Sequence, residues 1–593
     1  MATTQPMRTV HAGGLRAADV GRTVALAGWV NARRDHGGVV FVDLRDVTGI
    51  AQVVLNPGDL PGRADVIHGL RDEFCISVTG TVSPRPEATV NRDLPTGEID
   101  VVAADVTVLS PAQPLPFQID DRSDVDEVKR LQYRYLDLRR PRMAANLRAR
   151  SAVVAAMRRT MDELGFSEIE TPTLVASTPE GARDMLVPSR LRPGHFYALP
   201  QSPQLFKQLL MVSGVERYYQ VARCYRDEDF RADRQVEFTQ LDIEGAFWGQ
   251  EDVLATLEHV AVSVVRATRG IELERPFPRL TYAEAMDRFG TDKPDTRFGM
   301  EIHDLSDVLA DTEFRAFSGV LAGGGTVRGV NAGPRGLSRA ALDDLTDHAK
   351  ELGAGGLVWA VVEDDGSLRS PVAKFLSDGE RAGVAGALEA SPGDLLLIVA
   401  DTRRVASGVL GQLRLELGKP TGHDDLAFLF VVDFPVFDVD DDGGLTPAHH
   451  PFTAPHDVAE MRDSPESALS RAYDMVLNGS ELGSGSVRIH DPEVQAAVFD
   501  VLGITRQDAE RRFGWFLEAL RYGTPPHAGF AIGIDRLVAI IQDEPNIREV
   551  MPFPKTQTGA DPLTGSPSRV EDSQLDELGI DVRHEVRAAW TEA

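Results

Sequence analysis

Residues 225–244 read YRDEDFRADRQVEFTQLDIE, which is an arginine-bearing turn followed by a strand of alternating character. Alternate side chains of a strand point to the same side of the sheet. One face of this strand therefore carries an aromatic ring, an amide and two carboxylates, from Phe238, Gln240, Asp242 and Glu244. Such a face suits the floor of a ligand site better than a hydrophobic core. The alternative is an edge hairpin with a solvated face, and the rest of the chain must discriminate between them.

Length and composition indicate a soluble protein of several domains. The chain has 593 residues, and single cores stop growing at roughly 250–300 residues. Its first ten residues lack an apolar core that could serve as a signal peptide, and no apolar stretch is long enough to span a bilayer. The only cysteines, Cys75 and Cys224, cannot supply a zinc cluster or a disulfide framework. These features predict a cytoplasmic protein.

The charge is strongly negative overall but is unevenly distributed. A net charge of −29 argues against a nucleic-acid binder, because neutralising phosphates requires cations. Residues 21–54, however, carry four arginines against three aspartates, and residues 141–160 carry five arginines and no acid. The acidity therefore lies elsewhere, and RNA binding remains open.

The N-terminal 110 residues are rich in short alternating strands, expected at 23–30, 39–46 and 50–55. This pattern predicts an OB-fold barrel, whose open face stacks bases on exposed aromatic side chains. Phe41 lies on the polar face of its strand and is the candidate for stacking. The alternative is a generic small barrel in which Phe41 is merely packed.

Further along, apolar residues recur with helical spacing at Leu147, Val154, Met157, Met161 and Leu164, which predicts a helix that ends at Gly165. A strand is expected next, over residues 167–171, and it leads into a proline.

Two later segments have features of ligand-binding motifs, but neither contains a complete motif. Residues 285–425 form a mixed α/β pattern with glycine-rich turns, but they contain neither a phosphate loop nor a dinucleotide-binding spacing. Residues 438–443 match the front half of an EF-hand loop, but the twelfth position is His449, so calcium binding is not expected. This acidic segment is interpreted as a hairpin tip.

Three stretches together resemble the class II aminoacyl-tRNA synthetases. Residues 225–244 resemble motif 2, and the helix, strand and proline at 141–172 resemble motif 1, the dimer interface of that family. Residues 529–541 (GFAIGIDRLVAII) resemble motif 3, where glycines allow close approach of a nucleotide and an arginine meets phosphate at a helix start. All three occur in the expected order.

Four more segments are similar to the bacterial aspartyl-tRNA synthetases: residues 178–184, 201–208, 449–453 and 481–488. The resemblance runs along essentially the whole chain and implies a multidomain α+β protein with an OB-fold β-barrel, a class II antiparallel-sheet catalytic domain and an inserted α/β domain. The expected parts are an anticodon-binding barrel (1–110), a hinge (111–140), the catalytic domain in two parts (141–284 and 426–560), the insertion (285–425) and a C-terminal extension (561–593).

The resemblance also implies the site residues. For the charged residues of the aspartate pocket, the alternative is an ordinary surface ion pair. Arg226 and Arg536 would be catalytic, and Asp474 and Glu481 would hold Mg²⁺, which prefers one or two carboxylates plus substrate phosphates. L-aspartate would contact Glu180, Gln204, Lys207, Arg226, Asp242, His449, His450 and Arg488. ATP would contact Arg226, Asp227, Glu228, Gln235, Phe238, Glu481, Gly533, Ile534, Asp535 and Arg536.

On the barrel, the resemblance implies anticodon contacts by Arg34, Phe41, Gln52 and Asp100, with His36 and Ala88 at the places that govern tRNA discrimination. Ala88 is small where strict enzymes of the family tend to carry a longer cation, so the sequence favours charging of tRNA(Asp) and also of tRNA(Asn). The resemblance to motif 1 implies a homodimer, and no DNA or membrane partner is expected.

The alternatives are a strictly discriminating enzyme, an asparaginyl-tRNA synthetase, a non-catalytic RNA-binding relative and an amide-forming enzyme without tRNA. The cation Lys207 argues against a neutral amide substrate. The intact motifs argue against a relative that has lost catalysis, and the barrel against an enzyme that does not use tRNA.

Overall fold

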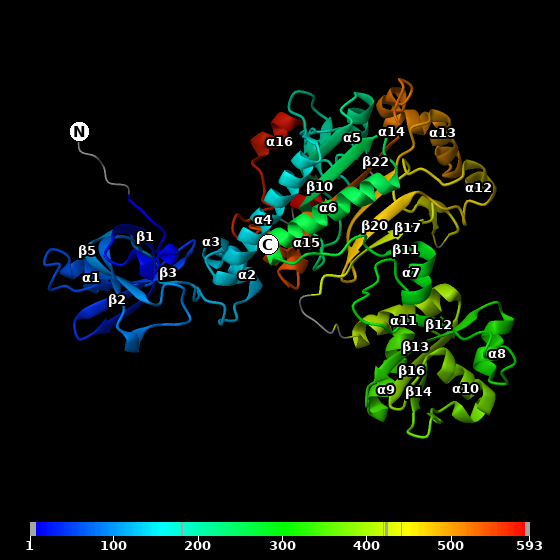
Figure 1. The fold of residues 1–593 in the computed structure, drawn as a ribbon. Helices are drawn as coiled ribbons and strands as arrows, with labels where there is room; N and C mark the ends of the chain where they lie inside the picture. The colour runs from blue at the N-terminus through cyan, green and yellow to red at the C-terminus, as the bar shows by residue number, and fades with distance from the viewer. Residues whose placement is uncertain (1–6, 179–181, 419, 421–424, 441, 588–593) are drawn as a thin grey trace. The chain divides into compact units, whose positions relative to one another are not determined.

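The computed structural model describes residues 7–178, 182–418, 420, 425–440 and 442–587. The chain forms two compact units, Met1–Ala144 and Ala145–Ala593, and Figure 1 shows the elements of each. None of the helices in the described ranges is long and apolar enough to cross a membrane.

The first unit contains a closed five-stranded barrel with the strand order β1-β2-β3-β5-β4. Its inward side chains alternate along each strand: Val40, Val42 and Leu44 are fully buried, whereas Phe41 between them is partly exposed. This confirms the OB-fold expectation and the predicted faces. The barrel comprises β1 (Thr23–His36), β2 (Val39–Asp46), β3 (Gly49–Leu55), β4 (Cys75–Pro84) and β5 (Ile99–Ser110), with α1 (Ala64–Gly69) between β3 and β4.

The first barrel strand is longer than the sequence indicated. It was expected to end at Val30, but it continues through a bulge and pairs with β2 as far as His36 opposite Val39. A bulge shifts the register by one residue without ending the ladder, so the polar run after Val30 still pairs. The glycines Gly37 and Gly38 form the tight turn with positive φ angles of 62° and 92°.

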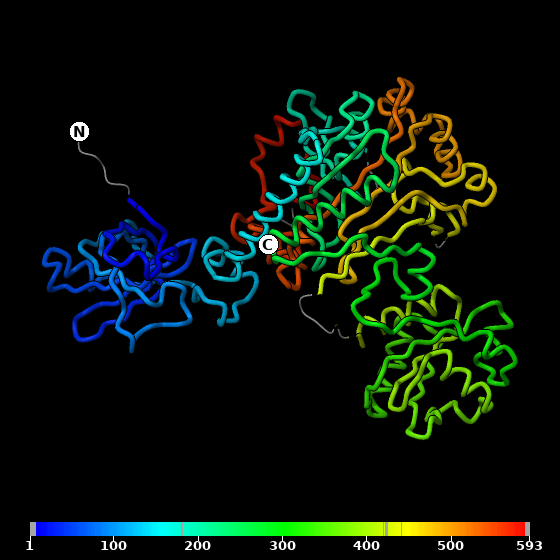
Figure 2. Tube along the Cα trace, in the orientation of Figure 1, coloured from blue at the N-terminus to red at the C-terminus, as the bar shows by residue number. Residues whose placement is uncertain are grey.

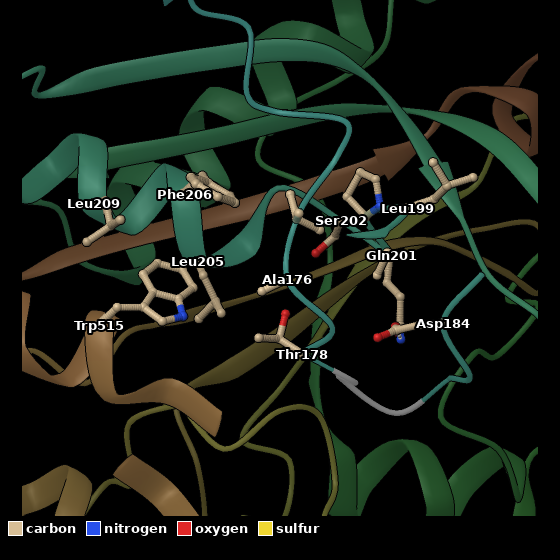
Figure 3. A pocket seen from close by; sticks show the side chains of 13 residues that line it. Ala176, Thr178, Asp184, Leu199, Gln201, Ser202, Leu205, Phe206, Leu209 and Trp515 are labelled. Atoms are coloured by element: carbon tan, nitrogen blue, oxygen red, sulfur yellow. Dashed lines mark hydrogen bonds between the residues drawn. The ribbon is translucent and has the colours of Figure 1, made fainter. Parts of the chain in front are cut away.

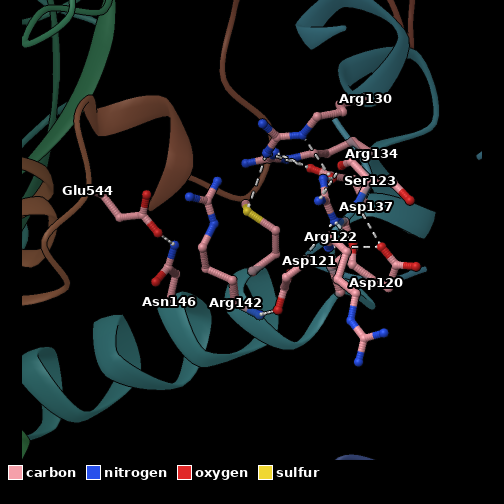
Figure 4. Close-up of polar contacts among 12 residues, drawn as sticks. Asp120, Asp121, Arg122, Ser123, Arg130, Arg134, Asp137, Arg142, Asn146 and Glu544 are labelled. Atoms are coloured by element: carbon pink, nitrogen blue, oxygen red, sulfur yellow. Dashed lines mark hydrogen bonds and ion pairs between the residues drawn. The ribbon is translucent and has the colours of Figure 1, made fainter. Parts of the chain in front are cut away.

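Two short helices, α2 (Glu127–Gln132) and α3 (Arg134–Asp137), follow the barrel. They surround a fully buried carboxylate, Asp137, whose oxygens lie 3.0 Å from Arg130 Nε and 2.6 Å from Arg134 Nη1 (Figure 4). Arg140 adds a third contact at 3.4 Å. A buried carboxylate requires such partners, so part of the stretch expected as a hinge is an ordered ion-pair cluster.

The second unit is built on an eight-stranded sheet with the order β11-β17-β20-β21-β22-β10-β9-β6. The four strands from residues 428–533 lie together in the middle of the order, and strands from residues 167–281 flank them on both sides. The tube in Figure 2 shows these distant segments side by side. The strands are β6 (Ser167–Glu168), β9 (Arg217–Tyr225), β10 (Glu237–Ala246), β11 (Arg279–Thr281), β17 (Phe428–Val432), β20 (Ala472–Leu477), β21 (Ser480–Val487) and β22 (His527–Gly533).

Helices cover one face of this sheet and form its main core. The predicted stripe lies on α4 (Pro141–Glu163), which packs Met157 and Met161 against α6 (Gln250–Arg269) and α15 (Ile534–Ile541). The helix stops before Gly165, whose φ is +75°. Since the helices take the face of Leu241 and Ile243, the opposite face of β10 is left for the site.

The strand expected over residues 167–171 forms only at Ser167–Glu168, so that prediction was too long. After Ile169, Thr171 donates its backbone N–H to the Gln220 side chain at 3.2 Å instead of to the strand ladder. The proline that follows disfavours further pairing.

The inserted segment forms a separate five-stranded sheet with the order β12-β13-β16-β14-β15 and a hydrophobic core on each face. Its elements are β12 (Ile302–Asp304), α8 (Arg315–Ala322), β13 (Thr326–Pro334), α9 (Arg339–Glu351), β14 (Val358–Val362), β15 (Leu368–Arg369), α10 (Asp378–Ala387), β16 (Asp394–Asp401) and α11 (Arg403–Leu417).

The remaining elements flank the large sheet. The acidic segment, of which Asp441 lies outside the described residues, is flanked by β18 (Phe437–Val439) and β19 (Leu445–Pro447), which pair as the expected hairpin. The others are β7 (Leu186–Pro188), β8 (Phe196–Ala198), α5 (Gln204–Val212), α7 (Tyr282–Phe289), α12 (Val458–Asp463), α13 (Pro492–Val501), α14 (Arg506–Ala519) and α16 (Asp572–Leu578).

Candidate active site

A cavity of about 580 Å³ lies over the free face of the large sheet. Its floor is formed by β10, β21 and β22, and α5 forms one wall. Most of the predicted site residues line it: Gln204, Lys207, Arg226, Glu228, Gln235, Phe238, Asp242, His449, His450, Asp474, Glu481, Arg488, Gly533, Asp535 and Arg536. Segments more than 300 residues apart in sequence therefore contribute to one site.

One end of the cavity is a buried network of two cations and two carboxylates. Lys207 Nζ lies 3.0 Å from Asp242 Oδ1 and 3.2 Å from Glu244 Oε2. Arg488 forms a bidentate interaction with the same Glu244, in which Nε donates at 3.0 Å and Nη2 at 3.2 Å. All four side chains are nearly inaccessible to solvent. A buried charge is tolerated only when it is paired, so the network is a fixed set of charges facing the cavity.

The environment sets the protonation of this network. Burial raises the pKa of Asp242 to about 6, although Lys207 opposes the shift. Burial would also raise the pKa of Glu244, but Arg488 and Lys207 outweigh it and the pKa is lowered. Burial and the Arg488 charge lower the pKa of His450 well below its usual value. At neutral pH the network therefore holds two anions, and His450 beside it is uncharged.

These pKa shifts predict a pH dependence of aspartate use. If Asp242 receives the ammonium of aspartate, as the sequence predicts, its protonation below about pH 6 removes this pairing, and kcat/KM for aspartate should fall about tenfold per pH unit. Because the folded pKa lies above the unfolded value of 3.8, the same group lowers conformational stability as pH rises towards 6. Aspartate-dependent pyrophosphate exchange from about pH 5 to about pH 8 measures this. A flat profile would contradict the assignment.

Elsewhere in the cavity lining, the Arg226 guanidinium lies 5.0 Å from the centre of the Phe238 ring. The buried donors Arg226 Nε and Gln204 Nε2 have no hydrogen-bond partner within the described part of the chain. Buried donors are rarely left unsatisfied. Their positions on the cavity wall fit a ligand rich in acceptor oxygens.

Two carboxylates in the cavity lining, Asp474 and Glu481, lie on the paired strands β20 and β21. Burial and then the charge of Asp474 raise the pKa of Glu481. His449 Nε2 lies 3.4 Å from Asp474 Oδ1. Two neighbouring carboxylates that repel each other are the arrangement that a divalent cation relieves, and Mg²⁺ needs only one or two of them. The residues therefore fit the expected magnesium ion.

Arg536 stands near the start of α15 and donates to the Glu481 carbonyl oxygen, while Nη2 lies 3.1 Å from Asp233. Its neighbour Asp535 has a structural environment: Arg150 contacts its carboxylate at 2.5 Å, and the Thr239 N–H donates to it at 2.8 Å. Asp535 thus joins the start of α15 to β10, which fixes Arg536 relative to the floor.

Several residues expected to contact a ligand have other partners or lie away from the cavity. Ile534 lies in the hydrophobic core, and Asp227, outside the cavity lining, faces Arg183 at 3.7 Å near the surface. The Gln235 amide is engaged with the backbone of Lys555, at 3.0 and 3.2 Å, and Glu228 pairs with Arg234 at 3.2 Å. Glu180 lies outside the described residues.

The cavity also has lining residues that were not assigned from the sequence. Gln240 lies on the cavity face of β10, as the alternation predicted, but the sequence assigned no ligand to it. Tyr282 and Asp292 come from the segment leading into the inserted sheet, and no sequence pattern places them here.

On the barrel, a polar network connects three of the proposed anticodon residues. Arg34 forms a bidentate pair with Asp43, at 2.9 and 2.8 Å. With its amide oriented to satisfy both neighbours, Gln52 accepts from Arg34 at 2.8 Å and donates to Asp100 at 3.0 Å. These side chains form a continuous patch of donors and acceptors across neighbouring strands.

The predicted stacking residue Phe41 contacts the predicted discrimination residue His36 edge to face, with ring centroids 5.9 Å apart. Ala88 is exposed in the 3₁₀ turn η3 (Glu87–Thr89).

Comparison with known proteins identifies the family of the chain. The family description "tRNA synthetases class II (D, K and N)" matches residues 126–557, and "OB-fold nucleic acid binding domain" matches residues 24–109. The "Aspartate--tRNA(Asp/Asn) ligase" of Thermobifida fusca is 52% identical over 580 residues, covering 97% of this chain and 98% of that protein. The protein of the same name from Moorella thermoacetica is 52% identical over 580 residues, with coverages of 97% and 96%.

Among solved structures, the asparaginyl-tRNA synthetase of Pyrococcus horikoshii complexed with asparaginyl-adenylate shares the fold, with a TM-score of 0.58, 19% identity and coverage of 95% of this chain and 99% of that one. The matched family description extends over most of this chain, and the two bacterial relatives are about half identical to it along nearly their whole length. The chain therefore belongs to the class II tRNA synthetase family (D, K and N).

Proposed function

We propose that this protein ligates L-aspartate to the 3′ end of tRNA(Asp), and also of tRNA(Asn), through an aspartyl-adenylate made from ATP. The observation that carries the proposal is the buried network of Lys207, Arg488, Asp242 and Glu244 at one end of the cavity. Aspartate brings one ammonium and a side-chain carboxylate, and this network offers an anion and two cations to meet them.

The substrate fits without leaving a buried charge unpaired. Asp242 receives the ammonium, and Lys207 and Arg488 receive the side-chain carboxylate. Of the Lys207 contacts, the one to the Ile243 carbonyl oxygen is long, at 3.3 Å, and is the one that a substrate carboxylate would replace. Asparagine would bring a neutral amide to two cations, which is a weaker match.

The reaction then needs mainly positioning and charge stabilisation. The substrate α-carboxylate attacks the α-phosphorus of ATP, and the bond to pyrophosphate breaks. Arg226 holds the α-phosphate and the reacting carboxylate, Phe238 stacks the adenine, and Arg536 holds the end of the triphosphate. Asp474 and Glu481 would hold Mg²⁺, which neutralises phosphate charge when bound. The 3′-terminal adenosine hydroxyl then attacks the acyl carbon and releases AMP.

The barrel is proposed to bind the anticodon of either tRNA. His36 and Ala88 present no long cation, so nothing at these positions repels the third anticodon base, which distinguishes the two tRNAs. We further propose that the enzyme acts as a homodimer, with α4 and β6 in the position of the family's dimer motif, and that it acts in the cytoplasm.

Charging of purified transcripts tests the function and its breadth. We expect aspartate to be attached to both the tRNA(Asp) and the tRNA(Asn) transcripts, with asparagine as the negative control. Aspartylation of tRNA(Asn) that is weaker by more than about a thousandfold, about 4 kcal/mol at 1.4 per tenfold, would identify a strictly discriminating enzyme. Attachment of asparagine in place of aspartate would overturn the proposal.

Phe41→Ala should impair tRNA charging while leaving aspartate activation intact. Base–aromatic stacking contributes about 1–3 kcal/mol per base, so kcat/KM for tRNA should fall about 5- to 150-fold. Pyrophosphate exchange needs no tRNA and serves as the internal reference. Val39→Ala, on the same strand and partly exposed, is the matched control. If exchange falls together with charging, Phe41 is a packing residue.

A further inference from the structure

The stretch that leads into the inserted sheet, residues 290–300, reaches the active site, and we call it the linker segment. Its Asp292 lines the active-site cavity. The linker segment also packs against the turn between β20 and β21, because a Cβ placed on Gly479 would lie 3.1 Å from the Asp295 Cβ. Glu481 follows this turn on β21. The linker segment therefore borders the part of the cavity that carries the proposed magnesium carboxylates.

The inserted segment holds the linker segment through one buried arginine on α11. Arg414 is fully buried, and its guanidinium donates to backbone carbonyl oxygens of the linker segment. The distances are 2.7 Å to Asp295, 2.9 Å to Phe298, 2.9 Å to Gly299 and 3.1 Å to Met300. The Phe298 ring also lies over the guanidinium, 4.3 Å from its central carbon. Because the donors of a guanidinium have a fixed geometry, these contacts fix the path of the backbone.

Lys293 lies in the linker segment directly after Asp292, and its side chain is exposed. Burial and then the charge of Asp474 raise the pKa of Glu481. The positive charges of Arg536 and then of Lys293 act in the opposite direction on this pKa. The effect of a charge decreases with distance and with screening by water. Lys293 therefore lies close to the carboxylate that Arg536 also approaches.

The balance of charges in this region favours a further cation. Asp292, Asp474 and Glu481 are carboxylates of the cavity lining, and ATP adds a highly charged triphosphate. Arg536 is so far the cation assigned to the triphosphate. The ammonium of Lys293, a compact charge on a flexible stem, is well suited to phosphate oxygens. The ordinary alternative is a solvated surface lysine that only offsets the neighbouring carboxylates.

We propose that Lys293 binds the β- and γ-phosphates of ATP and then the leaving pyrophosphate, and that Arg414 positions it by fixing the linker segment. This inference rests on the proposed function and gives the inserted segment a part in aspartate activation. In that step an oxygen of the aspartate α-carboxylate forms a bond to the α-phosphorus. The bond from this phosphorus to the bridging oxygen breaks, and its electron pair stays on pyrophosphate. Lys293 meets the resulting charge as an ammonium and keeps its proton.

The test measures the Michaelis constants of aspartate-dependent pyrophosphate exchange. Lys293→Gln should raise the KM for pyrophosphate and for ATP by about 3- to 20-fold, the range expected for a charged contact made by an exposed side chain. The KM for aspartate should change by less than about twofold. Lys293→Arg should recover most of the affinity, because a guanidinium also binds phosphate. Lys350→Gln is the matched control, an exposed lysine on α9.

A double-mutant cycle tests the part assigned to Arg414. Arg414→Met removes the contacts to the carbonyl oxygens and should raise the same two Michaelis constants. Added to Lys293→Gln, it should change the KM for pyrophosphate by less than about a further twofold, because both substitutions remove the same contact. Leu396→Ala, in the core on the other face of the inserted sheet, is the control for lost stability and should leave both constants unchanged below its melting temperature. If Arg414→Met does not fold, Arg414→Lys takes its place in the cycle.

The outcomes separate the possible failures. Unchanged KM values for ATP and pyrophosphate in folded Lys293→Gln would overturn the proposal, as would an equal increase in the KM for aspartate. Equal effects of the Arg414 variant and Leu396→Ala would show that Arg414 acts only through stability. If the wild type catalyses no aspartate-dependent exchange, the proposed function fails first, which none of the other outcomes implies.

Discussion

Lys207→Ala is expected to reduce aspartate-dependent pyrophosphate exchange by at least about a hundredfold. A hydrogen bond to a charged group contributes roughly 1.5–3 kcal/mol, and the loss of orientation adds to this. The structure adds a second effect, because Lys207 lies between Asp242 and Glu244. Its removal leaves these two carboxylates close together in a buried site without the Lys207 ammonium. They would then also repel the side-chain carboxylate of the substrate.

The same change should also lower conformational stability. Breaking a buried ion pair by removing one partner typically costs about 3–5 kcal/mol, so thermal melting of the variant must accompany the exchange assay, which is run well below the melting temperature. Lys350→Ala is the matched control, since Lys350 is an exposed lysine that pairs with Asp347 on helix α9 of the inserted segment. Near-normal exchange by a folded Lys207→Ala protein would show that the aspartate pocket has been assigned incorrectly.

Local patterns of the sequence were sufficient for the parts of the fold that depend on periodicity. The alternation in residues 237–244 correctly separated the core face of β10 from its cavity face. The helical stripe of Met157 and Met161 correctly predicted the buried side of α4. In both cases the apolar residues recur with the period of the secondary structure, a strand or a helix, so the buried face can be predicted from their spacing alone.

Contacts between distant segments could not be obtained in this way. Arg488 and Glu244 are 244 residues apart, yet they form a two-bonded buried pair. The sequence assigned Lys207 to the substrate but gave no sign that two carboxylates of β10 already hold it. Strand ends were also mispredicted at β1 and β6, because pairing partners and not local propensity decide where a ladder stops.

A second cavity, lined by Phe206 and Trp515, illustrates the same limit (Figure 3). Trp515 lies on α14, a helix whose sequence carries no recognised motif, and it meets Phe206 only because α14 packs against α5. By contrast, the neighbouring Gln201 and Gln204 fall within a segment whose resemblance to a family was evident. Similarity to a family therefore identifies residues that lie in shared sequence motifs. Residues that reach a cavity only through the packing of distant helices are identified from the structure.

Arg226→Gln should cause the largest decrease in activity, about 10²- to 10³-fold in the kcat of pyrophosphate exchange. Arg226 is proposed to contact both the α-phosphate and the attacking carboxylate, where charge develops in the transition state. Removing one preorganised donor from such a position costs roughly 2.7–4 kcal/mol. The KM for aspartate should change much less, because Lys207 and Arg488 hold the other end of the substrate.

Folding should be little affected by this change, because the Arg226 guanidinium stabilises the protein mainly through its position 5.0 Å from the Phe238 ring, and a cation–π interaction contributes about 0.5–1 kcal/mol at accessible sites. Arg226→Lys should recover only part of the rate, because lysine keeps the charge but not the planar fork. Arg223→Gln is the matched control, since Arg223 lies on the adjacent strand β9 and pairs with Glu237 outside the cavity. A decrease in kcat smaller than about tenfold, or an equal decrease for Arg223→Gln, would show that Arg226 does not contact the reacting atoms. Neither result is compatible with a donor that acts on them.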